Sequence, residues 1–174
     1  MALASLLVQK QPAILERWLN LVFESYPSET SRFLKKEKDR FLNPIAYQLS
    51  RGLTGLYQVV AQDLGREEAV KHLDEVIRVR AVQDLSPAQG MAFIFLLKPV
   101  IRAALADELK DQQSFRELMD LEDKIDGLAL LGFEVYLQRR EKLFEIRLSE
   151  IKNMISGLLR RTGLDLEAPE QHDG

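Results

Sequence analysis

The sequence predicts an all-α, bundle-like domain of about five or six helices that ends in one long helix. Apolar residues recur at three- and four-residue steps along most of the 174 residues, which is the period of a helix and not the two-residue alternation of a strand. The range Ser114–Arg161 contains no proline, and the helical period continues through it. We therefore expect one long helix over about residues 114–161, within a single domain over residues 1–163.

The composition argues against several classes of function. The chain has no cysteine, which removes disulfides, thiolate metal sites and cysteine nucleophiles. Its net charge of −3 argues against a nucleic-acid partner, because phosphate binding needs a clustered positive surface. The most apolar run, Met91–Leu97, is too short to cross a bilayer. We expect a cytoplasmic protein without membrane insertion.

The first helix is predicted from about Pro12 to Tyr26. Proline suits the first turn of a helix, where its missing N–H costs no hydrogen bond. The apolar stripe of this helix consists of Leu15, Trp18, Leu19, Val22 and Tyr26. The segment 28–40 that follows mixes basic and acidic residues, which is typical of a solvated charged turn. The alternative interpretation is a basic site for an acidic partner or ligand.

The next helix is predicted to start at Asn43 and Pro44, residue types that favour the N-cap and the first helical position. Gly52 and Gly55 lie inside it, although glycine costs up to about 1 kcal/mol against alanine in a helix. We expect these two glycines to let another helix approach closely. Gly65 is expected just after the C-terminal end of the helix.

Two further helices are predicted between residues 66 and 109. The first ends near residue 84. Ser86 and Gln89 have the spacing of a capping box, with Pro87 between them, and they open the second helix. That helix is apolar on nearly every side, which predicts a central place in the core. Pro99 lies inside it and predicts a kink near residues 95–98.

The long helix is predicted to open at Ser114 and Glu117, which also have capping-box spacing. Its second half carries an apolar stripe at alternating three- and four-residue steps, a pattern typical of coiled coils. The stripe consists of Phe144, Leu148, Ile151, Ile155 and Leu158. We expect these five residues to make the contact of a homodimer. The polar, acidic tail 164–174 is expected to be disordered.

The chain offers few residues for catalysis or for holding a cofactor. It has no glycine-rich phosphate loop and no nucleophile motif. Its two histidines, His72 and His172, do not form the paired Glu-x-x-His motifs of a di-iron bundle. His72 is the one weak candidate for a haem ligand, but it lies off the centre of the inner face of its helix. We expect a protein that is not an enzyme and that has no cofactor or metal.

One polar cluster stands out, at the end of the helix that precedes Ser86. It consists of Arg78, Arg80, Gln83 and Asp84. Arginines in the last turn of a helix complement its dipole. Two interpretations stay open. In the first, an arginine bridges this corner to a carboxylate of the long helix; in the second, the cluster is a patch that senses a ligand or partner.

Four segments of the chain carry a family resemblance by their order and spacing: Ile14–Trp18, Phe41–Pro44, Arg80–Pro87 and Tyr136–Lys142. Together they resemble the RsbRD N-terminal domain family, over about Ile14–Arg147. Domains of that family stand at the front of RsbT co-antagonist proteins of bacterial stress signalling. The resemblance implies a sensory or scaffolding input domain that is globin-like in fold, lacks haem and forms dimers.

In these relatives the last helix continues toward a STAS output domain, which assembles into stressosomes with the kinase RsbT. Only a short tail follows Arg161 in this sequence, without room for a STAS domain. We therefore expect a non-enzymatic, dimeric sensor or regulatory adaptor that contacts a regulatory protein partner. The alternative hypothesis is a sensor that holds a small ligand or a haem-type cofactor in its helical core.

Overall fold

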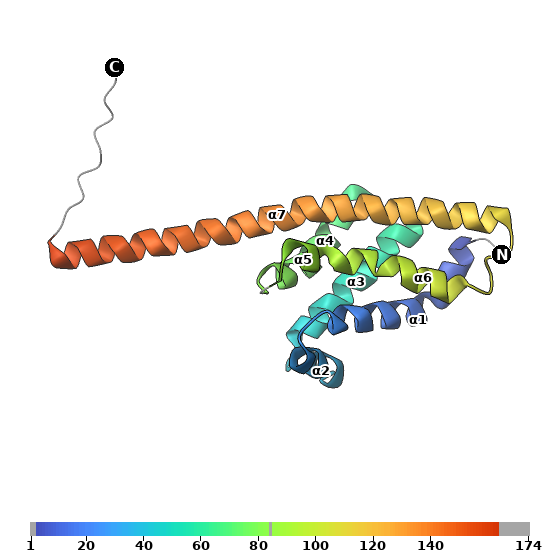
Figure 1. Cartoon of the computed structure of the whole chain (residues 1–174), viewed down its shortest axis with the longest axis horizontal. Helices are drawn as coiled ribbons and strands as arrows, with labels where there is room; N and C mark the ends of the chain where they lie inside the picture. The colour runs from blue at the N-terminus through green and yellow to red at the C-terminus, as the bar shows by residue number, and fades with distance from the viewer. Residues whose placement is uncertain (1–2, 84, 164–174) are drawn as a thin grey trace, which may run out of the picture. The chain divides into compact units, whose positions relative to one another are not determined.

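The structure is a computed structural model of the chain, and it describes residues 3–83 and 85–163. Over these residues it is all-α and contains no strand, which confirms the predicted fold class (Figure 1). The described helices are α1 (Leu3–Glu24), α2 (Ser28–Lys36), α3 (Pro44–Gln62), α4 (Arg66–Ala81), α5 (Pro87–Phe95), α6 (Leu97–Leu105) and α7 (Gln112–Thr162). The long C-terminal helix is α7. Asp84 and the tail 164–174 lie outside the described residues.

The chain divides into two compact units, residues 1–139 and residues 140–174. The first, called here the domain unit, holds α1 to α6 and the first part of α7. The second, called here the C-terminal unit, holds the rest of α7. Each unit is described by itself below.

The core of the domain unit is built around Trp18 of α1, whose side chain is fully buried. Its indole Nε1 donates a hydrogen bond to the carbonyl oxygen of Phe93 at 2.7 Å, so the polar group of this large side chain is satisfied in the core. Tyr57 of α3 is buried in the same way, and its hydroxyl donates to the carbonyl oxygen of Leu7 at 2.8 Å. These two bonds connect α1 to α5 and to α3.

Helices α3 and α4 approach closely at two glycines. A Cβ atom on Gly52 would lie 2.5 Å from Cγ2 of Val76, and one on Gly55 would lie 2.2 Å from Nδ1 of His72. Both distances are too short for carbon, so only glycine permits this packing. The predicted close approach is confirmed. The end of α3 differs from the prediction, because Asp63 and not Gly65 takes the left-handed conformation, with φ of 56°.

The apolar stretch 87–105 forms two helices instead of one. The Ser86–Gln89 capping box that opens α5 is present, as predicted. The helix breaks between Phe95 and Leu97, which confirms the predicted kink, because Pro99 has no N–H to continue the ladder. By length and composition this stretch could cross a membrane, but such a stretch is equally typical of a buried core helix. Its inward side chains fill the core: Met91, Phe93, Ile94, Leu97, Val100, Ile101 and Leu105.

Two predicted helix starts are wrong. Helix α1 begins at Leu3, so Pro12 lies inside the helix and not in its first turn. Burial of the upstream leucines, among them Leu7, stabilises the turns that precede the proline. Helix α7 begins at Gln112. There the carboxylate of Asp111, and not Ser114, caps the helix, accepting from the backbone N–H and the hydroxyl of Ser114 at 2.8 Å each.

Glu117 has a different role from the predicted one at the start of α7. Its Oε2 accepts from the backbone N–H of Leu3 at 3.0 Å, and its Oε1 accepts from the side-chain amide of Gln113. The first bond satisfies an N–H in the opening turn of α1, where helices have no internal acceptor. Glu117 therefore ties the start of α1 to α7.

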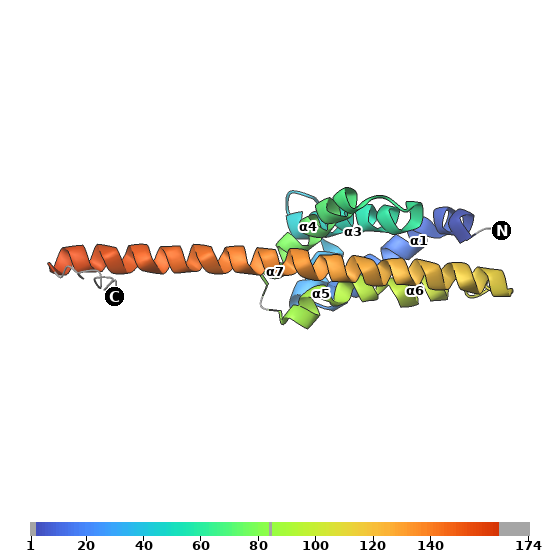
Figure 2. The ribbon, with the colours of Figure 1, turned by 90° about the horizontal axis from the view of Figure 1, so that it is seen from above.

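The first part of α7 runs along α6, as the two views of the ribbon show (Figure 2). Its buried face consists of Leu118, Leu121, Ile125, Leu128, Ala129, Gly132, Val135 and Tyr136. Beside this face, Arg102 of α6 holds both carboxylate oxygens of Glu122, and Lys98 lies 2.6 Å from Asp126. A buried apolar face flanked by ion pairs is the arrangement that fixes a helix along its neighbour.

Candidate functional site

Arg80 lies at the corner between α4 and α5 and is completely buried. Its Nε donates to the carbonyl oxygen of Gly90 at 2.9 Å, and its Nη2 donates to that of Gln89 at 2.7 Å. Nη1 and Nη2 each lie 3.3 Å from the hydroxyl of Ser25, just after α1. One guanidinium thus joins the ends of α1 and α4 to the first turn of α5.

Arg80 is held by carbonyls and aromatic rings and not by a carboxylate. Its guanidinium carbon lies 5.2 Å from the ring centre of Tyr26 and 5.6 Å from that of Phe93, distances at which a cation is attracted to a ring. No ion pair to Arg80 occurs within residues 3–83 and 85–163. Burial lowers the pKa of Arg80, but an arginine stays charged in proteins. Burial also raises the pKa of Tyr26, an effect that the nearby Arg80 partly offsets.

Tyr136 of α7 packs against this corner. A Cβ atom on Gly90 would lie 2.7 Å from Cε2 of Tyr136, so the ring fits only over a glycine. Gly90 therefore contacts Tyr136 on one side and accepts from Arg80 through its carbonyl. The Arg80 corner, defined here as Ser25, Arg80, Gly90 and Tyr136, brings together α1, α4, α5 and α7.

The polar cluster predicted from the sequence does not form one surface. Arg78 is exposed and pairs with Asp74 one turn earlier at 3.1 Å, whereas Arg80 is in the core. Gln83 is half-buried, and its backbone N–H donates to the carbonyl oxygen of Arg80. Asp84 lies outside the described residues. A sensing role for the cluster stays a prediction, and among its described residues Arg78 and Gln83 are accessible to a partner whereas Arg80 is not.

Two ion pairs link α4 to α7. Arg66 at the start of α4 lies 3.0 Å from Glu134. Nearer the corner, the pair has the opposite sense to the one predicted, because the arginine is on α7 and the carboxylate is on α4. Arg139 of α7 donates through Nε and Nη2 to the two carboxylate oxygens of Asp74, each at 2.5 Å. Burial raises the pKa of the Asp74 carboxyl, but hydrogen bonds from Arg139 and Arg78 outweigh burial and hold it below its usual value. The sequence signal for Arg139 is its position four residues after Val135, on the continuation of the buried face.

His72 is engaged by carboxylates on both ring nitrogens. Nδ1 lies 3.3 Å from Glu75, and Nε2 lies 3.5 Å from Glu68. The ring also packs against Gly55. Both ring nitrogens of His72 therefore lie near carboxylates of its own helix. No group of three potential metal ligands occurs in the described part of the chain.

The C-terminal unit presents an uncovered apolar stripe on α7. It consists of the residues that the sequence predicts as a dimer contact: Phe144, Leu148, Ile151, Ile155 and Leu158, which are between 40% and 62% exposed. The same seven-residue period extends back into the domain unit, where Leu130 and Leu137 are exposed as well. The sequence analysis missed these two residues because they stand between core-facing residues of the same helix, so their separate spacing is hidden.

The domain unit uses many of its polar side chains in packing, and the C-terminal unit exposes an apolar stripe of the kind that marks interaction sites. The comparison with protein families is specific. The family model described as the RsbT co-antagonist protein rsbRD N-terminal domain matches residues 12–151. The chain belongs to this family of regulatory sensor domains. No curated protein and no solved structure matches the chain.

Proposed function

We propose that the protein is a non-enzymatic input or adaptor domain of bacterial stress signalling that acts in the cytoplasm as a homodimer. Membership of the RsbRD N-terminal domain family supports the regulatory role. The observation that carries the proposal is the apolar stripe of the C-terminal unit, in which five large side chains at coiled-coil spacing are exposed.

The stripe argues for a partner helix on energetic grounds. Most of the stability of a helix in a protein comes from tertiary packing of its apolar face, and the stripe of the C-terminal unit has no such packing within the described residues. Full burial of a leucine, isoleucine or phenylalanine side chain stabilises by roughly 1.5–3 kcal/mol each. A second copy of the chain presents the same stripe, and a two-fold axis would place the two stripes against each other. A two-stranded coiled coil therefore explains why this segment is helical.

The signal would travel from the Arg80 corner along α7. Tyr136 and Arg139 hold α7 to α4 and α5 within the domain unit. A partner or ligand that repacks the α4–α5 corner would change the contacts of Tyr136. Tyr136 and Arg139 lie on the same helix, Gln112–Thr162, as the predicted dimer contact, so a change in their contacts would act on the helix that carries the stripe.

The dimer is tested by the molar mass in solution. Light scattering after gel filtration at tens of micromolar is expected to give twice the chain mass. The double variant Ile151→Asp/Ile155→Asp should be monomeric, because it buries charge in the contact. The control Ser149→Asp/Asn153→Asp adds the same charge at two exposed positions off the stripe and should stay dimeric.

Two results would contradict the proposal. One is a monomeric mass of the unaltered protein at these concentrations. The other is a loss of the dimer in the control variant as large as in the stripe variant, since dissociation would then follow from charge alone and not from the stripe.

A further inference from the structure

The connection between α2 and α3 exposes large apolar side chains that the fold does not use. Phe41 is 78% exposed and Leu42 is 65% exposed, and Phe33 on α2 is exposed as well. Neighbouring apolar residues exposed on one segment mark an interaction site more often than single ones do. The docking surface is defined here as this apolar group together with the basic residues of segment 28–42.

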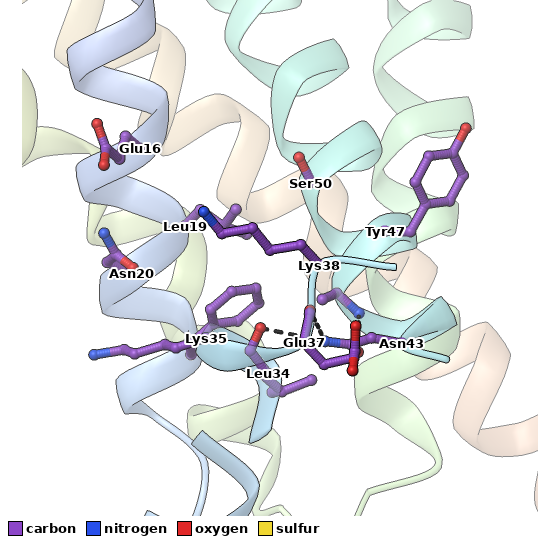
Figure 3. A pocket seen from close by; sticks show the side chains of 12 residues that line it. Glu16, Leu19, Asn20, Leu34, Lys35, Glu37, Lys38, Asn43, Tyr47 and Ser50 are labelled. Atoms are coloured by element: carbon purple, nitrogen blue, oxygen red, sulfur yellow. Dashed lines mark hydrogen bonds between the residues drawn. The ribbon is translucent and has the colours of Figure 1, made fainter. Parts of the chain in front are cut away.

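This connection is firmly held. The buried side chain of Asn43 donates through Nδ2 to the carbonyl oxygens of Leu34, at 3.2 Å, and Glu37, at 2.9 Å. Its Oδ1 accepts from the backbone N–H of Ala46 at 3.1 Å. The dashed lines around Asn43 in Figure 3 mark the bonds that close the loop. Phe41 and Leu42 are therefore presented by a fixed scaffold, which lowers the entropy cost of binding.

The cations of the docking surface are not neutralised by the acidic residues between them. The carboxylate of Glu37 accepts from the backbone N–H of Asp39, and that of Asp39 accepts from the N–H of Phe41. Lys35 pairs with Glu24 of α1, at 2.8 Å. The remaining basic residues form no ion pair with any carboxylate in the described ranges: Arg32, Lys36, Lys38 and Arg40.

A hollow of about 400 Å³ lies between α1, α2 and the start of α3. The charged side chains that line it are Glu16, Lys35, Glu37 and Lys38. Buried side chains of Phe23 and Leu34 contribute to its apolar floor. Lys38 extends across the hollow toward Leu19 of α1 (Figure 3). The volume of the hollow lies within the range of roughly 300–1,000 Å³ that is typical of sites for organic ligands. The hollow can therefore receive an apolar side chain, and Lys38 in its lining can pair with a carboxylate beside that side chain.

We propose that the docking surface binds an acidic amphipathic helix of a protein partner. Its apolar side chains would contact Phe41 and Leu42 and fill the hollow, and its carboxylates would pair with Lys36, Lys38 and Arg40. Charge complementarity supports this partner, because five basic and three acidic residues in segment 28–42 give a net charge of +2 in a chain of net −3. The concave shape favours a protein helix over an anionic membrane, whose surface would leave the hollow unfilled.

The test uses a fluorescently labelled synthetic helix of about four turns, with leucine and phenylalanine on one face and glutamate elsewhere. Binding is measured by fluorescence anisotropy against the full-length protein. We expect saturable binding of this peptide and at least about tenfold weaker binding of two controls. In one control lysine replaces every glutamate, and in the other the same residues are scrambled so that the apolar face is lost.

Variants locate the site. Lys36→Glu/Lys38→Glu is expected to weaken binding at least about tenfold, and Phe41→Ser/Leu42→Ser is expected to do the same. Matched controls change equal charge or equal apolar surface at other exposed positions and should alter the affinity less than about twofold. These controls are Lys110→Glu/Arg116→Glu and Phe115→Ser/Met119→Ser. The stripe variant Ile151→Asp/Ile155→Asp should bind the peptide unchanged, which separates this proposal from the dimer.

Each of the following results would overturn the proposal. The acidic peptide does not bind at up to about 1 mM, or the controls lower its affinity as much as the docking-surface variants do. The protein prefers vesicles of equal parts phosphatidylglycerol and phosphatidylcholine to the peptide. Finally, the variant Phe41→Ser/Leu42→Ser has a lower molar mass in solution than the unaltered dimer, which would make this surface a contact between copies of the chain.

Discussion

At the scale of single residues, Arg80 shows how a buried charge can be accommodated without a carboxylate. Two carbonyls, a hydroxyl and two aromatic rings surround the guanidinium. Hydrogen bonds to a charged group stabilise by roughly 1.5–3 kcal/mol, and the planar fork of arginine can reach several acceptors at once. The side chain therefore acts as a polar cross-link inside an apolar core.

Arg80→Ala is expected to lower the free energy of unfolding by about 3 kcal/mol, because it removes these bonds and leaves a cavity. Arg78→Ala should change it by less than about 0.5 kcal/mol, since an exposed ion pair contributes little. Urea unfolding followed by circular dichroism measures both. Similar losses in the two variants would show that Arg80 is no more important to the core than its exposed neighbour.

Asp74 gives the fold a contribution that depends on pH. Its pKa in the folded state lies below its usual value, so this contribution is present above the unfolded pKa of about 3.9 and is lost as the pH falls through the folded value. Asp74→Asn should therefore be less stable than the unaltered protein near pH 7, and the difference should shrink near pH 3. Urea unfolding at both pH values checks this.

Arg139→Gln provides the complementary measurement for Asp74. It removes the main hydrogen-bond donor that lowers the pKa of Asp74. Like Asp74→Asn, this variant should therefore be less stable than the unaltered protein near pH 7, with a smaller difference near pH 3. If the stability difference between either variant and the unaltered protein grew as the pH falls, the pKa of Asp74 would not be lowered in the folded state.

At the scale of the elements, glycines distinguish positions where two helices touch from positions where a helix faces open space. Gly52 is inside the α3–α4 contact, whereas Gly127 of α7 has no atom within 4 Å of a built Cβ. Both positions lie within helices, so glycine costs each of them the same intrinsic helix propensity. Only the packing differs, and the packing decides the sign of a substitution.

Gly52→Ala is expected to destabilise by about 1–3 kcal/mol, because the new methyl group overlaps the stiff, branched side chain of Val76. Gly127→Ala is expected to stabilise by up to about 1 kcal/mol. Thermal unfolding of the two variants should shift the midpoint in opposite directions. A shift in the same direction for both would contradict the close packing of α3 on α4.

Much of the fold could be predicted from the sequence, because its signals are local. Asn43, Ser86 and Gln89 cap helices through neighbours three residues away, and Pro99 breaks a helix through its own missing N–H. The prediction that Pro12 lies in the first turn is wrong, because the leucines upstream of it pack into the core against residues that are distant in the sequence. Local patterns alone do not contain that contribution.

Less of the candidate sites could be predicted, because they depend on which polar residues become buried. Arg80 lies four residues after Val76, on the buried face of α4, yet an arginine in a last turn is ordinarily explained by the helix dipole. Its acceptors come from α5 and from Ser25, just after α1. The hollow beside Asn43 likewise needs α1, α2 and α3 together. Spacing along the chain does not specify either assembly.

At the scale of the whole molecule, the two units should respond differently to protein concentration. Helix α7 has a covered face in the domain unit, whereas the C-terminal unit has an uncovered stripe. Hydrogen exchange by mass spectrometry should therefore show slower exchange of residues 140–162 as the concentration rises, while α3 and α4 exchange at a constant rate. Concentration-independent exchange of residues 140–162 would contradict dimerisation through the stripe.

The regular spacing of the stripe also sets a rule for building fusion proteins. Continuing its period past Leu158 places the next stripe position at Thr162, the last residue of α7. A dimeric coiled coil joined there in the same heptad phase would continue the stripe and hold two copies of the chain together. An insertion of two residues at the junction would rotate the added helix by about 200° about its axis, and its apolar side would then point away from the stripe.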